Sequence, residues 1–399
     1  MNQFSRRDFM KAVGLAGAGS LIGAASVPAQ GAAKPVGLSK MPLRAFGKTG
    51  VKVSILSLGG IFDIMSNQLI LQKALDWGVK YWDTADCYTG GKSEEGIGAY
   101  FEKNPDVRKR IFLVSKSDRR DPAGLTELLT RSLERLKTDH LDLYFLHGVG
   151  NPKELNADVK AWAEKAKKDG KIKFFGFSTH ANMDKCLMEA SKLGWIDGIM
   201  TTYNYRLVHD DAMKAGVEAC AKAGIGLTAM KTQAKKAAGE DPAGAKLIEH
   251  FTAQGYTAEQ AKLKVIWDNP QFSAVCSAMY TVSVLSSNVA AATDQVKLSA
   301  LDHEALLEEA RVTCDGYCAG CSHLCEAAIG GQVSIGDAMR GLMYLRNYGN
   351  RDQAREVFAG MSEVQRQGLA ALDYAAAERV CPHRLPIGAM MREASELLA

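Results

Sequence analysis

The sequence has little excess of charge of either sign. Its 49 basic and 45 acidic side chains leave a net charge of +4 on 399 residues. Nucleic-acid binding needs a concentrated basic field, which this balance does not supply. The chain also lacks internal repeats and low-complexity linkers. We therefore expect a protein that acts on small molecules, without a nucleic-acid partner, built from one large and one smaller unit.

The first residues carry the pattern of an export signal. Ser5–Lys11, which contains Arg6-Arg7, precedes an uncharged Gly/Ala-rich run over Ala12–Ala33. This pattern predicts a twin-arginine signal over residues 1–29, bound by the twin-arginine export machinery and cleaved after Ala29. We expect a periplasmic or otherwise extracytoplasmic protein with no stable membrane span after cleavage. A retained membrane anchor is the alternative. Export in the folded state fits a cofactor that is inserted in the cytoplasm.

Strand signals occur as short apolar runs that alternate with amphipathic segments. The eight runs are Ser54–Leu58, Tyr81–Thr84, Ile111–Ser115, Leu141–Leu146, Lys171–Phe177, Gly198–Thr202, Ile225–Met230 and Ser273–Ser277. Continuous apolar runs are typical of parallel strands that are covered on both faces. The pattern predicts an α/β fold, a (β/α)8 TIM barrel over residues 41–298.

Helix signals stand between these runs. Asp121-Pro122 offers an N-cap and a first-turn proline, and Asn151-Pro152 repeats the device. Further helices are predicted over Asn182–Leu193 and Asp210–Lys222. In residues 299–399 only helical stripes remain, which are Leu301–Ala310, Ile335–Leu345, Gln353–Phe358 and Gly388–Leu398. These stripes are too few for an independent core, so we expect the tail to dock on the barrel or to be held by cross-links or metal.

Four polar residues follow the ends of neighbouring strand runs. Asp83, Tyr88, Lys116 and His147 would all lie on the carboxyl-terminal rim, where barrel enzymes place their reactive groups. An ammonium lowers the pKa of a nearby phenol, so Lys116 would make Tyr88 a proton donor for carbonyl reduction. Asp83 would hold Lys116, and His147 would orient the carbonyl oxygen. Each residue alone could be structural, but the set together favours an active site.

These residues carry a resemblance to the aldo-keto reductase family from Met41 to Ala291. Leu43–Ser54 looks like the family's N-terminal hairpin, and Asp83-Thr84-Ala85 with Tyr88, Ser93-Glu94 and Gly98 looks like its signature. The resemblance implies that Asp83, Tyr88, Lys116 and His147 are the catalytic residues. It also implies a small carbonyl or alcohol substrate, with NADP(H) or NAD(H) as hydride donor or acceptor.

The cofactor positions that the resemblance implies are only partly kept. Ser178 matches, but Thr179 stands in place of an asparagine that holds the nicotinamide carboxamide, and Met200 in place of a glutamine. Met230 replaces the ring that stacks on nicotinamide, and Lys231 beside it could meet a phosphate.

On the adenine side Asn288 matches, while no Lys or Arg lies where the family often holds the 2′-phosphate. The choice between NADP and NAD therefore stays open. So does a second function, a cofactor-poor binding or electron-transfer protein.

Five of the nine cysteines lie in the tail. Cys318, Cys321, Cys325 and Cys381-Pro382 resemble the ligand set of a C-terminal ferredoxin-like extension, which implies one [4Fe–4S] cluster and a possible electron-transfer partner. Cys314 is an alternative ligand. In an exported protein the same thiols could instead form disulfides or bind zinc. We assign no role to Cys87, Cys186, Cys220 and Cys276 in the barrel.

Overall fold

The computed structural model of the protein describes residues 40–234 and 241–399. Eight parallel strands close into a barrel in the order β10-β3-β4-β5-β6-β7-β8-β9, which confirms the predicted (β/α)8 fold. The strands are β3 (Leu56–Gly59), β4 (Tyr81–Asp83), β5 (Phe112–Ser117), β6 (Leu141–Leu146), β7 (Ile172–Thr179), β8 (Gly198–Thr202), β9 (Gly226–Met230) and β10 (Phe272–Ala278). Each overlaps a predicted run. The first begins at Leu56, because Ser54 belongs to the preceding hairpin.

An antiparallel hairpin closes the amino-terminal end of the barrel. It pairs β1 (Leu43–Ala45) with β2 (Lys52–Ser54) and inserts the fully buried ring of Phe46 at its turn. This ring lies against the backbone of Gly198 and Gly226, where β8 and β9 begin, and a Cβ on either glycine would come within 2.7 Å of it. The carboxyl-terminal end of the barrel is therefore the end left for a ligand.

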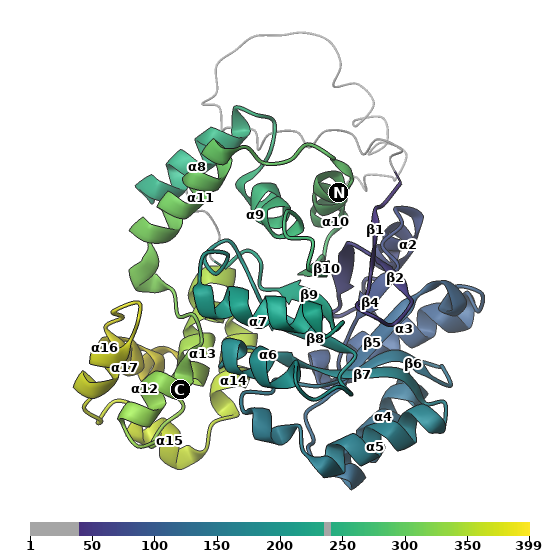
Figure 1. Cartoon of the computed structure of the whole chain (residues 1–399), viewed down its shortest axis with the longest axis horizontal. Helices are drawn as coiled ribbons and strands as arrows, with labels where there is room; N and C mark the ends of the chain where they lie inside the picture. Colours follow the sequence, from purple (N-terminus) through teal and green to yellow (C-terminus); the bar gives the residue numbers. More distant parts are fainter. Residues whose placement is uncertain (1–39, 235–240) are drawn as a thin grey trace, which may run out of the picture. The chain divides into compact units, whose positions relative to one another are not determined.

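Helices cover the outside of the barrel (Figure 1). They are α2 (Leu69–Asp76), α3 (Lys92–Lys103), α4 (Pro122–Arg135), α5 (Ala157–Lys168), α6 (Met183–Ala190), α7 (Asp211–Lys222), α8 (Pro242–Thr252), α9 (Ala258–Trp267) and α10 (Val282–Thr293). Asp121 caps α4 as predicted. The prediction for Asn151-Pro152 was wrong, because Asn151 caps only the short η3 (Pro152–Glu154), and α5 begins after a second cap, Asn156. Two Asn caps this close together cannot be ranked from sequence.

The tail is helical, as predicted. It contains α11 (Ala300–Val312), η4 (Cys314–Gly316), α12 (Ser322–Ala328), α13 (Ile335–Tyr348), α14 (Arg351–Ala359), α15 (Glu363–Gly368), α16 (Ala375–Val380) and α17 (Ile387–Leu398). Residues from Ile329 to Leu398 form a hydrophobic cluster of their own, which is larger than the predicted stripes indicate. The sequence undercounted this core because short helices such as α15 and α16 are too brief to show a stripe.

The tail docks on the barrel through polar contacts. Asn204, after β8, donates to the hydroxyl of Tyr317 at 2.9 Å. Asn182, which precedes α6, accepts from the backbone N–H of His323 in α12 at 2.8 Å, and its own N–H donates to Gly320 at 2.7 Å. Leu306 of α11 belongs to the barrel's hydrophobic core. In Figure 1 the green-yellow tail helices accordingly lie beside α6, and α11 runs beside α8.

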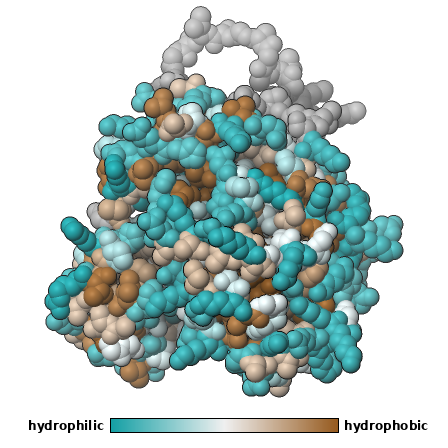
Figure 2. Space-filling view, viewed as in Figure 1, coloured by the Kyte–Doolittle hydropathy of each residue, from teal (hydrophilic) through white to brown (hydrophobic). Residues whose placement is uncertain are grey.

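The described surface offers no continuous apolar face on the side drawn in Figure 2, where hydrophobic patches are small and separated by hydrophilic side chains. In the part of the chain that the structure describes, no helix has the length and apolar character needed to cross a membrane. The predicted twin-arginine signal over residues 1–29 lies outside the described residues.

Candidate active site

The four residues predicted to form the site meet at the carboxyl-terminal rim. Asp83 is the last residue of β4, and Tyr88 opens η1 (Tyr88–Gly91) in the loop after it. Lys116 is the last but one residue of β5, and His147 follows β6 directly. The parallel order β4-β5-β6 places them side by side.

Lys116 links two of the other three residues. Its Nζ donates to Asp83 Oδ2 at 2.7 Å, to the carbonyl of Thr84 at 2.7 Å and to the hydroxyl of Tyr88 at 3.1 Å. The side chains of Lys116 and Asp83 are 1% and 2% exposed, so the pair is shielded from water. Because three acceptors surround it, the ammonium is held in one position.

The pKa of Tyr88 differs from the sequence expectation. Burial raises it well above the ordinary value, and the negative charge of Asp83 raises it further, so the prediction of a lowered pKa was wrong. Sequence shows the neighbouring ammonium but not the loss of hydration around the phenol. Tyr88 is therefore protonated at neutral pH, with the Lys116 ammonium placed to stabilise a phenolate once the proton has left.

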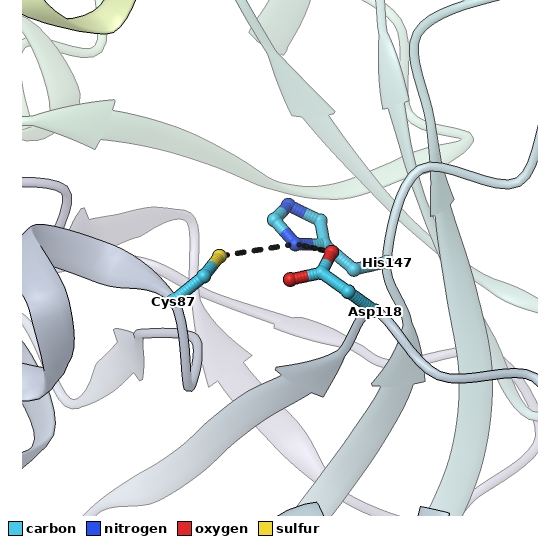
Figure 3. Close-up of side chains that lie close together, drawn as sticks. All are labelled: Cys87, Asp118 and His147. Atoms are coloured by element: carbon cyan, nitrogen blue, oxygen red, sulfur yellow. Dashed lines mark hydrogen bonds and ion pairs between the residues drawn. The ribbon is translucent and has the colours of Figure 1, made fainter. Parts of the chain in front are cut away.

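His147 lies against Tyr88 with ring centroids 5.7 Å apart. Its Nδ1 is 2.9 Å from Asp118 Oδ1 and 3.6 Å from Cys87 Sγ. Figure 3 draws both contacts as dashed lines. Burial lowers the pKa of His147, although Asp118 acts in the opposite direction. The pKa of Asp118 is lowered overall. Burial raises it, but the hydrogen bond from His147 and the charge of the His147 ring lower it.

Asp118 was missed by the sequence reasoning. It stands two residues beyond Lys116, directly after β5, so its place at the rim was a usable signal. An ionised carboxylate only accepts hydrogen bonds, so Nδ1 of His147 must carry the hydrogen. In the neutral ring Nε2 is then an acceptor, which suits a substrate hydroxyl, and only the protonated ring donates to a carbonyl oxygen.

The residues predicted to hold a cofactor are spread over the elements from β7 to α10 (Val282–Thr293). Ser178 Oγ accepts from the backbone N–H of Gly148 at 3.0 Å, and Thr179 Oγ1 donates to the carbonyl of Ala181 at 2.9 Å. Met200 is buried inside the barrel and Met230 packs against the same cluster. Asn288 Nδ2 donates to Ser277 Oγ at 3.0 Å. The hydroxyl of Thr179 is thus turned to the protein backbone.

Lys231 lies in a small cavity between the rim and α13. The cavity measures about 50 Å³ and is lined by both barrel and tail residues. The Nζ of Lys231 is buried without a hydrogen-bond partner and lies 4.7 Å from the ring centroid of Tyr344 in α13. Burial, and after it the charge of Arg340, lowers the pKa of Lys231 well below its usual value.

A second cavity collects the four predicted ligand cysteines. Cys318, Cys321, Cys325 and Cys381 all line it, together with Pro382 and apolar side chains of the tail. Cys318 also lines the cavity that holds Lys231. Cys314 is exposed and is not among the lining residues, so the structure does not bring it to the other four. Burial raises the pKa of the Cys318 and Cys325 thiols to about 12.

The model of the Aldo/keto reductase family matches residues 61–241, which span the strands that carry the rim residues. Among similar proteins, the uncharacterised oxidoreductase YqkF of Bacillus subtilis is 35% identical over 122 residues, 28% of this chain and 39% of the relative. The oxidoreductase YrpG of the same bacterium is 29% identical over 208 residues, 46% of this chain and 64% of the relative.

These matches therefore span less than two thirds of the first two relatives' length. L-galactose dehydrogenase of Arabidopsis thaliana is 24% identical over 302 residues, 68% of this chain and 94% of the relative. Among solved structures, a putative aldo-keto reductase of Pseudomonas aeruginosa is 25% identical with a TM-score of 0.52, over 64% of this chain and 96% of that one. An aldo-keto reductase of Bacillus halodurans has a TM-score of 0.56 at 21% identity, over 67% and 96%, and shows the fold.

Proposed function

We propose that the protein is an oxidoreductase of the aldo-keto reductase type, which moves a hydride between a nicotinamide cofactor and a carbonyl or alcohol substrate. The observation that carries the proposal is the 3.1 Å contact between Lys116 Nζ and the Tyr88 hydroxyl. Asp83 binds the same Lys116 Nζ. A structural tyrosine has no need of a buried ammonium on its hydroxyl. The family match of residues 61–241 supports the same reaction class.

Tyr88 is the general acid in the direction of carbonyl reduction. As hydride reaches the carbonyl carbon, negative charge grows on the oxygen, which takes the Tyr88 proton, and Lys116 stabilises the phenolate left behind. In the direction of alcohol oxidation the same phenolate takes the hydroxyl proton. Nε2 of the neutral His147 ring accepts from an alcohol hydroxyl, and the protonated ring donates to a carbonyl oxygen, with Nδ1 held by Asp118 in both cases.

The hydride is supplied or accepted by NADP(H) or NAD(H). A relative in Schizosaccharomyces pombe, 31% identical over 157 residues, carries NADP(+) in its name. Of the residues predicted for the cofactor, Met230 offers a partly exposed apolar surface for a ring and Ser178 a hydroxyl. Thr179 fits less well because its hydroxyl is bound to Ala181. Asn288 contributes no cation for a 2′-phosphate, so the proposal covers both dinucleotides.

The test is the variant Tyr88→Phe. Turnover of an aldehyde panel, measured as dinucleotide oxidation, should fall by at least about a hundredfold, since general acid catalysis contributes on that order. Circular dichroism should show an unchanged fold. The matched control is Tyr280→Phe, which removes the hydroxyl of an exposed tyrosine and should keep full activity. Unchanged turnover in the Tyr88 variant would defeat the assignment.

A second candidate function is a binding or electron-transfer protein that has lost the dinucleotide. The observations in its favour are at the cofactor positions, where the hydroxyl of Thr179 is bound to the carbonyl of Ala181 and Met200 is buried inside the barrel. Mass spectrometry of small molecules released from the purified protein separates the two functions. A retained or titratable dinucleotide favours the enzyme, and a protein that binds none favours the second candidate.

For the tail we propose one [4Fe–4S] cluster bound by Cys318, Cys321, Cys325 and Cys381. The four thiols line one cavity with apolar walls, a setting that suits a cluster. Among the described residues no three of these sulfurs lie within 4.8 Å of one another. A tetrahedral zinc ion with bonds of ~2.3 Å would hold the sulfurs about 3.8 Å apart, closer than the structure groups any three of them. When bound, such a cluster stores and passes single electrons.

Iron, sulfide and zinc analysis after anaerobic purification tests the cluster. Cys318→Ser should lose the iron, while Cys314→Ser, which changes a cysteine outside the cavity, should keep it. Zinc with neither iron nor sulfide, or disulfides shown by mass spectrometry, would contradict the cluster.

We further propose that the chain is exported to the periplasm by the twin-arginine route, with cleavage after Ala29. The support is the Arg6-Arg7 pair before the uncharged run. Fractionation of cells that produce the full chain tests this: Arg6→Lys with Arg7→Lys should keep the protein in the cytoplasm. An equal periplasmic share of both proteins would contradict the route.

A further inference from the structure

The cavity between the barrel rim and α13 is lined by basic side chains. Among the described residues that line it are Lys231 from the loop after β9 and Arg340 and Arg346 from α13, and none of the lining residues is acidic. Arg340 is partly paired with Asp337 on its own helix, at 3.0 Å, and Arg346 with Glu393. Among the described residues Lys231 Nζ has no hydrogen-bond partner, and the ring of Tyr344 lies 4.7 Å from it.

Two residues that line this cavity from the barrel also carry buried polar atoms without a partner. Nδ1 of His180 and Oγ1 of Thr202 are buried, make no hydrogen bond, and belong to lining residues. With Lys231 Nζ they make three buried groups without partners around one small space. A buried polar group without a partner costs free energy, so three at one place call for a ligand that pairs with them.

The chemistry of these groups specifies an anion with several acceptor atoms. A lysine ammonium and a guanidinium only donate hydrogen bonds, and a hydroxyl and an imidazole can donate as well. A bound anion would offset the charge of Arg340 and favour the protonated form of Lys231. The volume of about 50 Å³ is several times what one water needs, roughly 10–15 Å³ in the same measure, so it accepts a group of a few heavy atoms. A carboxylate or a phosphate meets all three conditions.

The cavity lies within one small molecule's length of the catalytic set. His180, in its wall, has its ring centroid 6.4 Å from that of His147, and His147 lies 5.7 Å from the ring of Tyr88. The pyrophosphate of a dinucleotide is internal and needs space on both sides, whereas the acid group of a substrate is terminal and needs space on one side only.

We propose that this cavity is an oxoanion site, and that the substrate carries a carboxylate or phosphate which Lys231 and Arg340 bind while its carbonyl lies against Tyr88. The substrate assignment rests on the proposed function, while the anion site does not. The tail therefore supplies part of the substrate site, through Arg340. This assignment moves Lys231 from the cofactor, where the sequence placed it, to the substrate.

Thermal unfolding of the full chain tests the anion site without any turnover. Inorganic phosphate should raise the midpoint more than sodium chloride at equal ionic strength, since a ligand that binds only the folded state stabilises it. Lys231→Met should raise the midpoint without phosphate, because it removes a buried polar group without a partner, and should abolish the response to phosphate. Arg340→Gln should also abolish the response. The exposed controls Lys109→Met and Arg351→Gln should keep it.

Each outcome supports or refutes either the anion site or the substrate assignment. If phosphate stabilises the protein no more than chloride does, or if both cavity variants keep the response, the anion site is refuted. Phosphate that binds equally well in the presence of saturating dinucleotide supports the substrate assignment, and competition between the two overturns it. Tyr88→Phe should keep the response to phosphate, so a failure of the proposed reaction would not be mistaken for a failure of this site.

A matched substrate pair tests the assignment in turnover. Succinic semialdehyde and butanal have chains of equal length and differ in the carboxylate. Arg340→Gln should raise KM for succinic semialdehyde about tenfold to a hundredfold, the range of a lost charged hydrogen bond, with little effect on butanal. An equal change for both aldehydes would overturn the role of the cavity in substrate binding.

Discussion

Arg206 and Glu309 form a buried ion pair that joins the barrel to the tail. Arg206 Nη2 lies 3.0 Å from Glu309 Oε2, and the two side chains are 4% and 2% exposed. Arg206 also donates to the carbonyl of Ala310 at 2.9 Å, and Tyr205 donates to Glu309 at 2.6 Å. The segment after β8 thus fixes α11, from which the rest of the tail continues.

Glu309→Gln should destabilise the protein by about 3–5 kcal/mol, because it leaves the Arg206 guanidinium buried without a counter-charge. Urea unfolding measures the difference. Glu308→Gln is the matched control, since Glu308 is the preceding residue and is 61% exposed, and its replacement should cost less than about 0.5 kcal/mol. Equal effects of the two changes would show that the buried pair does not hold the tail.

Asp83→Asn should both destabilise the protein and abolish turnover. The ammonium of Lys116 would lose its buried carboxylate at 2.7 Å, at a cost of about 3–5 kcal/mol. In the double variant with Lys116→Met the buried charge is gone, so stability should largely return while activity stays absent. A single Asp83 variant that is as stable as the parent protein would contradict the buried-pair interpretation.

Asp118→Asn should lower the pKa of His147 still further. Burial lowers this pKa, and the hydrogen bond and charge of Asp118 act against burial, so their loss removes an effect that raises it. The fraction of protonated His147 at a given pH therefore falls, and any pH dependence of activity that reports this ring moves to lower pH. NMR titration of the imidazole measures the shift. The control is Asp139→Asn, which disrupts the Asp139–His140 pair at 2.6 Å and should leave the His147 titration unchanged.

Gly98→Ala should destabilise the barrel by about 1–3 kcal/mol or more, the usual cost of overpacking. A Cβ at Gly98 in α3 would come within 1.9 Å of the carbonyl oxygen of Arg135, a backbone atom that cannot turn aside. Gly150→Ala is the control, because a Cβ there meets only Ala181, at 3.7 Å. Similar stability of the two variants would show that α3 and the end of α4 can move apart.

Much of the barrel could be predicted because its signals are local. Runs such as Leu141–Leu146 coincide with a strand, and Asp121-Pro122 starts α4, since apolar period and cap chemistry depend on neighbouring residues. Asp83, Tyr88, Lys116 and His147 meet because a parallel barrel brings strand ends together.

The rest depends on contacts between distant residues. Burial raises the pKa of Tyr88, and the extent of burial cannot be predicted from the sequence. The role of Asp118 depends on its contact with His147, which is 29 positions away in the sequence. The core of the tail depends on short helices that pack on one another. Lys231 meets Arg340 only because the tail folds back on the rim.

Cys318 lines two spaces at once, the cysteine cavity and the cationic one. Whatever this sulfur binds or becomes alters the wall of both, so the redox or metal state of the tail and the affinity for an acid group are thermodynamically linked. Preparations that differ in the state of Cys318 would differ in their affinity for an anion. An affinity for phosphate or for an acidic aldehyde therefore has meaning only when the state of Cys318 is given with it.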